Sequence, residues 1–196
     1  MSSAQRREAI VDAAVELFAQ NGFRGTTTRQ IAAAVGVSEP VLYMHFAAKS
    51  DLYTAIIEKL SGGCGLALPP IQPGADDRAF LVSLAMGMVE WHEHDPARVR
   101  LLFYSALEGH ELSDAFYSRH VVPFFDAFSR YFQQRIKEGA FRKVDPRLAA
   151  RAFVNMVVKY GADVVIFRKA ADNVSARKKT IEAMVDIFLN GVKKQK

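Results

Sequence analysis

The stretch 26–46 constrains the fold of this chain more than any other part of its sequence. Ile31 and Val35 form the inward face of a predicted short helix. Gly36 follows, at the point where a left-handed residue often ends a helix and only glycine is unstrained. A second short helix is predicted after Ser38. Two short helices joined by a tight turn form a helix-turn-helix, whose second helix fits the major groove of DNA.

The same stretch carries specific signals for where its helices begin. One of the hydroxyls in 26–28 is expected to cap the first helix, and Ser38 is expected to cap the second by accepting from the Val41 amide. Pro40 falls in the first turn, where a missing N–H breaks no intrahelical bond. Ser50 is the expected cap of the helix that follows the motif. These signals predict a hairpin of two helices with further helices on either side.

The flanking sequence supports a compact helical domain around the hairpin. Upstream, apolar residues recur at helical spacing and end at Asn21-Gly22, a signal for a helix C-terminus. The upstream stripe is Ile10, Ala13, Ala14, Leu17 and Phe18. Within the second motif helix, Leu42 and Phe46 are four residues apart and are expected to point inward together.

Residues 1–60 resemble the DNA-binding domain of the tetracycline-repressor (TetR) family of bacterial transcription regulators. The matching residues are Ala13, Ala14, Leu17, Phe18, Gly22, Phe23, Thr27, Thr28, Ile31, Ala32, Val35, Gly36, Val37, Ser38, Leu42, Tyr43, His45, Phe46, Lys49 and Leu52. The rest of the chain is similar to the family only in length and in its all-helical character.

The resemblance implies which residues contact DNA. The implied set is Thr27, Thr28, Arg29, Ser38, Glu39, Pro40, Val41, Tyr43, His45 and Lys49. Phosphate contacts are expected from Thr27, Tyr43, His45 and Lys49, and base-edge or nearby backbone contacts from Arg29, Ser38, Glu39, Pro40 and Val41. Glu39 could accept from a cytosine amine or supply a favourable charge at a helix N-terminus, and Pro40 or Val41 could touch a thymine methyl.

Composition limits the other possibilities. The net charge is +5, but acidic and basic side chains balance within residues 1–60, so the motif and not the charge carries the DNA-binding prediction. No apolar run is long enough for a bilayer. The start of the chain has no signal-peptide pattern, and the lone Cys64 permits no internal disulfide. A reducing cytoplasm is therefore the expected location, with no membrane contact.

The chain as a whole is predicted to be all-α, with two domains. Residues 1–60 are the predicted helix-turn-helix DNA-binding domain of three helices, with its motif at 27–46, and 61–75, rich in Gly and Pro, are a linker. Residues 76–196 are a predicted helical bundle for effector binding and dimerisation. Its expected helices are 77–94, 97–107, 113–138 with a kink at Pro123, 146–169 and 175–192.

Two sets of apolar residues in the second domain have either a structural or a functional interpretation. The last two helices offer stripes that are either core or a four-helix dimer interface, and the resemblance favours the interface. This set is Phe153, Met156, Val157, Tyr160, Val164, Ile181, Met184, Val185 and Phe188. The middle helices offer a second set that is either core or the lining of an effector pocket. This set is Trp91, His92, Phe103, Tyr104, Phe125 and Phe128.

An enzyme is a weak alternative. The sequence has no Glu-x-x-His pair for a di-iron bundle, one Cys only, and no Gly-rich phosphate loop or nucleophile elbow. No metal and no cofactor are expected. The sequence predicts a homodimeric transcription regulator that binds a palindromic operator in double-stranded DNA, most simply a repressor released by a small apolar or aromatic effector. Activation, and a ligand-independent architectural DNA-binding protein, remain alternatives.

Overall fold

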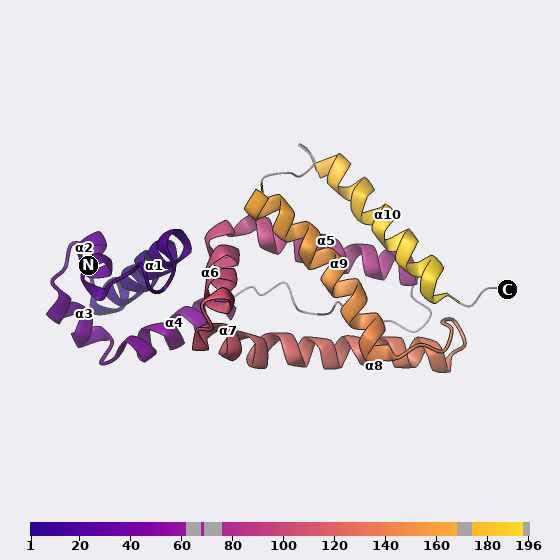
Figure 1. Ribbon diagram of the computed structural model, residues 1–196, viewed down its shortest axis with the longest axis horizontal. Helices are drawn as coiled ribbons and strands as arrows, with labels where there is room; N and C mark the ends of the chain where they lie inside the picture. The colour runs from indigo at the N-terminus through magenta and orange to yellow at the C-terminus, as the bar shows by residue number, and fades with distance from the viewer. Residues whose placement is uncertain (62–67, 69–75, 168–173, 194–196) are drawn as a thin grey trace. The chain divides into compact units, whose positions relative to one another are not determined.

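The computed structural model describes residues 1–61, 68, 76–167 and 174–193, and its regular elements are helical throughout (Figure 1). The prediction of an all-α fold is confirmed. The helices are α1 (Ser3–Asn21), α2 (Thr28–Val35), α3 (Glu39–His45), α4 (Lys49–Ser61), α5 (Asp77–His94), α6 (Pro96–Leu107), α7 (Glu111–Phe116), the π-helical turn η1 (Tyr117–Val121), α8 (Val122–Lys137), α9 (Pro146–Phe167) and α10 (Val174–Val192). Among the described residues, none of these helices has the length and apolar character needed to cross a bilayer.

The chain forms two compact units whose boundary differs from the predicted one. The first unit is Met1–Gly63 together with Asp95–Ser118, and the second is Cys64–His94 together with Arg119–Lys196. Segment 95–118, which the sequence assigned to the second domain, joins the first because α6 packs along α1. Val99 and Leu101 of α6 are buried. Apart from its residues 61 and 68, the predicted linker 61–75 lies outside the described residues.

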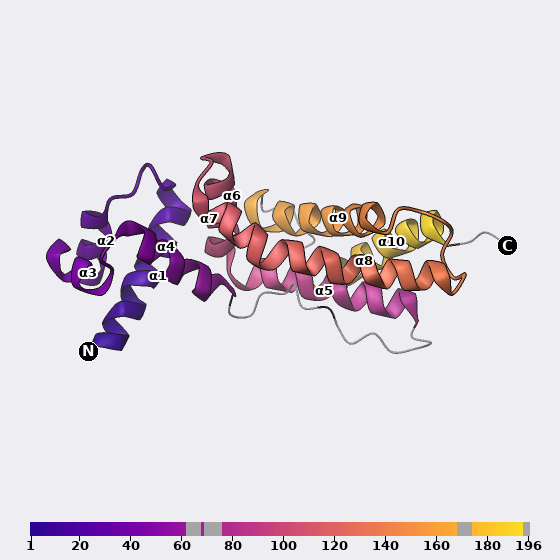
Figure 2. The same ribbon diagram turned by 90° about the horizontal axis from the view of Figure 1, so that it is seen from below.

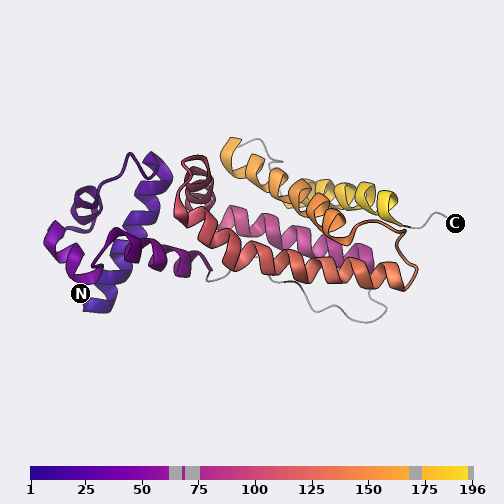
Figure 3. The ribbon, with the colours of Figure 1, turned by 60° about the horizontal axis from the view of Figure 1, so that its bottom comes forward.

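The first unit is arranged around α1. Helices α2, α4 and α6 all pack on α1, and α3 packs on α2 (Figures 1 and 3). Three residues of the apolar stripe predicted on α1, Ile10, Ala14 and Phe18, are fully buried, with 0% exposure. Helices as short as α2 and α3 depend on such tertiary packing, because isolated helices of this length are marginal in water.

The second unit consists of α5, α8, α9 and α10 packed around one apolar core. Helix α9 packs against both α8 and α5, and α10 packs against α5 (Figure 2). Phe128 lies at the centre of an aromatic cluster and is fully buried. The rings within 6.0 Å of it, centroid to centroid, are Phe124, Tyr131, Phe132 and Phe153. These aromatic residues therefore build the core of the unit.

The single helix predicted over 113–138 is wrong. Helix α7 ends at Phe116, a π-helical turn covers 117–121, and α8 begins at Val122 with Pro123 in its first turn. Proline has no N–H to donate to a preceding carbonyl, so the hydrogen-bond register changes before it. The predicted kink at Pro123 is thus a change of helix type and the start of a new helix.

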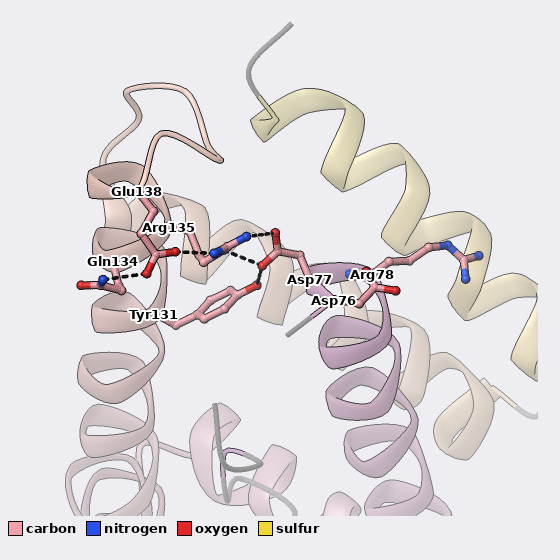
Figure 4. Close-up of polar contacts among 7 residues, drawn as sticks. All are labelled: Asp76, Asp77, Arg78, Tyr131, Gln134, Arg135 and Glu138. Atoms are coloured by element: carbon pink, nitrogen blue, oxygen red, sulfur yellow. Dashed lines mark hydrogen bonds and ion pairs between the residues drawn. The ribbon is translucent and has the colours of Figure 1, made fainter. Parts of the chain in front are cut away.

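A polar cluster ties the start of α5 to α8 and α10. The Tyr131 hydroxyl donates to Asp77 Oδ1 at 2.5 Å, and Arg135 Nη2 donates to Asp77 Oδ2 at 2.8 Å. Figure 4 shows Tyr131 and Arg135 of α8 pointing to Asp77, whereas Arg78 points the other way. Arg78 forms a two-bond pair with Asp186 of α10, at 2.7 and 3.1 Å. Burial, with the hydrogen bond to Asp77, raises the pKa of Tyr131.

Candidate nucleic-acid interface

Local hydrogen bonds build the turn between α2 and α3 as the sequence predicts. Thr27 caps α2: its Oγ1 accepts from the Gln30 backbone N–H at 3.2 Å, and Gln30 Oε1 accepts from the Thr27 N–H at 2.8 Å. Gly36 ends the helix in the left-handed region, with φ 72° and ψ 31°, and its N–H donates to the Ala33 carbonyl at 3.1 Å. Both predicted signals, a threonine cap and a left-handed glycine, are confirmed.

Two predicted serine caps are wrong. The Ser38 side chain makes no capping hydrogen bond to α3; instead its backbone carbonyl accepts from the Val41 N–H at 3.0 Å. Helix α4 begins one residue before Ser50, and Asp51 Oδ2 accepts from the Ala48 N–H at 3.1 Å. At both helix starts, more than one side-chain or backbone oxygen can accept from the unpaired N–H groups of the first turn. Residue type alone does not predict which oxygen accepts.

Helix α3 has a buried face and an exposed face. Leu42 and Phe46 are each 1% exposed, so the predicted inward pair is confirmed. On the other side, Pro40 is exposed, Tyr43 is 45% exposed and Met44 is 83% exposed. Met44 was not in the predicted DNA-contacting set, because the family pattern leaves that position open. The exposed face of α3 is therefore part aromatic and part aliphatic.

Thr28 connects the two helices of the motif. Its hydroxyl donates to the Glu39 carboxylate across the turn, and its Oγ1 lies 3.5 Å from the Tyr43 hydroxyl oxygen. Because a threonine hydroxyl has one hydrogen, donation to Glu39 leaves Tyr43 as the donor in the longer contact. Thr28, Glu39 and Tyr43, which the sequence proposed separately, thus form one hydrogen-bonded group between α2 and α3.

The other members of the predicted set differ in exposure. Those with exposed side chains are Thr27, Arg29, Ser38 and Pro40, and those half-buried are Thr28, Glu39, Val41, His45 and Lys49. The Lys49 ammonium lies 5.7 Å from the ring centroids of both Phe18 and Tyr53, within cation–π range. Lys49 is thus held at the edge of the motif by two aromatic rings.

The corner between α6 and α7 contacts the segment that follows α1 and helix α4, and sequence reasoning missed these contacts. Glu108 Oε2 accepts from the backbone N–H groups of Phe23 and Arg24, each at 3.2 Å. The His110 ring stacks on Phe23 at 4.0 Å and meets the edge of Tyr53 at 4.3 Å. No local signal could have found these contacts, because 85 residues separate Glu108 from Phe23.

Two ionisable groups in this corner titrate away from their usual range. Burial lowers the pKa of His110, and Lys49 lowers it further, whereas Glu111 and Glu108 oppose the change. The neutral ring accepts from the Leu112 N–H through Nδ1 at 3.2 Å, so His110 caps α7. Burial raises the pKa of Tyr53 to about 12, with help from Glu111 and Glu108.

Comparison with known proteins decides what kind of motif this is. Residues 10–56 match the family described as bacterial regulatory proteins, tetR family, and residues 92–191 match the AefR-like transcriptional repressor C-terminal domain. The chain belongs to the tetR family. This regulator therefore has a DNA-binding helix-turn-helix, and its family consists of transcriptional regulators and not of enzymes, as the sequence predicted. Regulators of this family bind DNA and small-molecule effectors and are dimers.

Individual proteins are similar to this regulator over most of its length. The regulator is 30% identical to the nucleoid occlusion factor SlmA of Marinobacter nauticus over 79% of each chain. It is 28% identical to the HTH-type transcriptional repressor KstR2 of Rhodococcus jostii, over 74% of this chain and 73% of that one. A TetR family regulator from Chloroflexus aurantiacus has the same fold, with a TM-score of 0.78 at 21% identity over 99% of this chain and 96% of that one. Another, from Pseudomonas syringae, has a TM-score of 0.73 at 23% identity over the full length of both.

The six predicted effector residues do not all lie in one unit of the regulator. Trp91 and His92 on α5 and Phe125 and Phe128 on α8 belong to the second unit. Phe103 and Tyr104 lie on α6 of the first unit and are 40% and 37% exposed. A hollow of 480 Å³ in the second unit is lined by none of the six; its lining is Asp126, Ser129, Arg130, Gln133, Asp145, Pro146 and Arg147.

His92 is the one predicted effector residue with a defined polar environment. It is 6% exposed, and its Nδ1 lies 2.6 Å from the Met88 carbonyl oxygen. Burial lowers the pKa of His92. Because a carbonyl oxygen only accepts, Nδ1 is the nitrogen that donates to Met88. Gly161 of α9 lies against this ring: a Cβ at that position would be 3.1 Å from the ring's Cγ.

The predicted dimer residues divide between core and surface. Phe153, Val157, Ile181 and Val185 are at most 1% exposed in the monomer, so they form the core of the second unit and offer no surface to a partner. The other five are half-buried: Met156, Tyr160, Val164, Met184 and Phe188. Helical spacing identifies an apolar face but does not say whether the chain or a partner covers it.

Proposed function

We propose that this regulator is a homodimeric repressor that binds a palindromic operator through α2 and α3 and leaves it when a small apolar or aromatic effector binds. The observation that carries the proposal is the geometry of the motif in a family of DNA-binding regulators. α3 is anchored by Leu42 and Phe46 and exposes Pro40, Tyr43 and Met44 on the opposite side. A helix so placed presents side chains to the major groove.

Phosphate contacts would fix the protein on the duplex and base contacts would choose the sequence. For phosphates we propose Tyr43 with Thr27, His45 and Lys49. Thr28, whose one hydroxyl hydrogen is donated to Glu39, would act at the interface by positioning Glu39 and Tyr43. For base edges we propose Arg29, Ser38, Glu39, Pro40 and Val41. The hydrogen bond from Thr28 gives Glu39 a third role, since a carboxylate held across the turn orients the start of α3.

The dimer would use the outward faces of α9 and α10. Met156 and Tyr160 on α9, and Met184 and Phe188 on α10, retain exposed surface at helical spacing, and Ile187 beside them is 72% exposed. A twofold dimer would place its two α3 helices at half-sites about 34–36 Å apart, or at a multiple of that distance. Replacement of Ile187 by Asp should weaken dimers, measured by sedimentation, and should reduce operator affinity at low protein concentration.

Effector binding is proposed for the second unit, among Trp91, His92, Phe125 and Phe128. Aromatic rings supply an apolar wall, and the neutral His92 supplies one polar group. In the proposed two-state mechanism the free dimer holds its α3 helices at operator spacing, and the effector favours a dimer that fits poorly. Coupling of about 1–3 kcal/mol, or about 5–150-fold in affinity, is typical of such linkage.

Selection against random duplex DNA tests the DNA-binding part. We expect a palindromic site with strong preference over random DNA, and titration at two salt concentrations should give a slope set by the phosphate contacts. Tyr43→Phe should weaken binding to all sequences alike, and Glu39→Ala should change the preferred sequence if Glu39 reads a base. Salt-sensitive binding without sequence preference would refute the repressor and favour the architectural alternative.

One observation favours a ligand-independent protein. Phe128 and Phe153 are fully buried against each other, with ring centroids 5.7 Å apart, so a ligand at that place requires the side chains to move. Small aromatic compounds can be screened by the fluorescence of Trp91, the one tryptophan of the chain, and by release of labelled operator. If no compound that changes Trp91 fluorescence releases the operator, the effector part of the proposal fails while the DNA-binding part stands.

A further inference from the structure

We propose that Met44 determines operator specificity by packing against the 5-methyl group of a thymine in each half-site. This inference rests on the proposed function, because it concerns the same interface with DNA. Met44 is 83% exposed, which equals the highest exposure of any large apolar side chain among the described residues. Its long thioether side chain is flexible and adapts to an irregular apolar surface.

Packing fixes the direction in which Met44 points. Leu42 and Phe46, two residues to either side of it, are each 1% exposed. The Arg7 guanidinium lies 4.9 Å from the centroid of the Phe46 ring on the buried side of α3. Since neighbouring helix positions lie about 100° apart, a residue midway between two buried ones lies on the opposite face. α3 therefore cannot bury Met44 without exposing its own core.

The polar groups of α3 lie elsewhere. Glu39 is hydrogen-bonded to Thr28, and the Tyr43 hydroxyl lies 3.5 Å from Thr28 Oγ1. The side chain four residues before Met44 on the same face is Pro40, which is exposed and has no donor. Together Pro40 and Met44 form an apolar strip on the exposed face of the helix.

An apolar strip can distinguish bases by contact with the thymine methyl group. In the major groove the thymine 5-methyl group is the apolar feature that separates a T·A pair from the others, and apolar side chains contact it. A single exposed apolar side chain is common on protein surfaces and needs no function. Met44 differs in its place, within the segment 10–56 that matches the family's DNA-binding region and on the helix that the motif presents.

The test removes the methyl group from DNA. In the selected operator, each thymine is replaced by uracil at symmetric positions of both half-sites, and affinity is measured by fluorescence anisotropy at constant salt. At the position that Met44 contacts, loss of one methyl group should weaken binding of the wild-type protein to the operator about fourfold. Loss of the methyl groups in both half-sites should weaken binding about 15-fold. Met44→Ala should bind the thymine operator more weakly and should no longer distinguish thymine from uracil at that position.

Two control variants make the result specific. Leu107→Ala removes a side chain of α6 with the same 83% exposure, and it should keep the full sensitivity to uracil. Met44→Leu retains an apolar side chain and should keep most of the sensitivity to uracil. Circular dichroism checks that each variant has the helix content of the wild type.

The possible outcomes separate this inference from the function on which it rests. The inference is supported if Met44→Ala loses the uracil effect while Leu107→Ala and Met44→Leu keep it. An operator without thymine in its half-sites, or a uracil effect of equal size in Met44→Ala and wild type, overturns it while the repressor proposal stands. A wild-type protein that selects no DNA sequence overturns both.

Discussion

The ion pair between Asp77 and Arg135 should stabilise the second unit far more than a surface pair would. Arg135 Nε lies 2.8 Å from Asp77 Oδ1, and the two side chains are only 20% and 10% exposed (Figure 4). Asp77 also accepts from the Tyr131 hydroxyl, and Arg135 pairs with Glu138. Each single substitution therefore leaves a polar group in a site with little water.

The expected magnitudes follow from what each variant leaves behind. Breaking a buried ion pair costs about 3–5 kcal/mol, and the lower end applies to Asp77→Ala because Arg135 retains Glu138 and some solvent contact. Arg135→Met should cost about 2 kcal/mol, because Asp77 retains the Tyr131 hydroxyl and the N-terminus of α5. The double variant should cost about 3 kcal/mol, which gives a coupling energy of about 2 kcal/mol.

Urea unfolding followed by Trp91 fluorescence measures these values, because the one tryptophan of the chain lies in the second unit. All variants must be compared at one protein concentration, since association adds to the apparent stability of a dimer. The pair formed by Arg78 and Asp186 is the control: its side chains are 42% and 48% exposed, so its cycle should give a smaller coupling. A coupling energy for Asp77 and Arg135 below about 0.5 kcal/mol, as in exposed pairs, would refute the reasoning.

Three further predictions test other parts of the structure. Gly161→Ala should lower the free energy of unfolding by about 1 kcal/mol, since the added Cβ meets the His92 ring. Gly87→Ala should raise the free energy of unfolding by about 0.5–1 kcal/mol, because an added Cβ there meets open space and alanine favours the helix. Urea unfolding measures both changes, and changes of the same sign would contradict the prediction. Tyr53 holds its proton more tightly when folded, with a pKa of about 12 against 10.0, so its contribution is complete below pH 10 and is lost as pH rises towards 12. Replacement of Tyr53 by Phe should remove that part of the alkaline loss, measured by circular dichroism. Glu108→Gln should speed amide exchange in the loop between α1 and α2, because a neutral amide holds the two N–H groups less strongly; unchanged exchange would mean that the carboxylate does not hold the loop.

Much of the motif could be predicted because its signals are local. The Thr27 cap, the left-handed Gly36 and the inward pair of Leu42 and Phe46 each depend on residues within a few positions of one another. The same locality explains the two failures: at Ser38 and Ser50 a nearby backbone or side-chain group satisfied the helix start instead. Exposure of Met44 follows from the burial of Leu42 and Phe46 on the other face of α3. The role of Met44 in base recognition depends on DNA, which the sequence of the chain does not describe.

The sequence by itself determined the all-helical fold, the helix-turn-helix and the family, because capping, turn geometry and apolar spacing are properties of short segments. Only the tertiary structure decided which apolar faces are core: Phe153 is fully buried while Tyr160, on the same helix, is half-buried. It also decided that α6 packs on α1 in the first unit and that Glu108 contacts Phe23. Such choices depend on competition between distant surfaces for burial, and spacing along one helix carries no record of that competition.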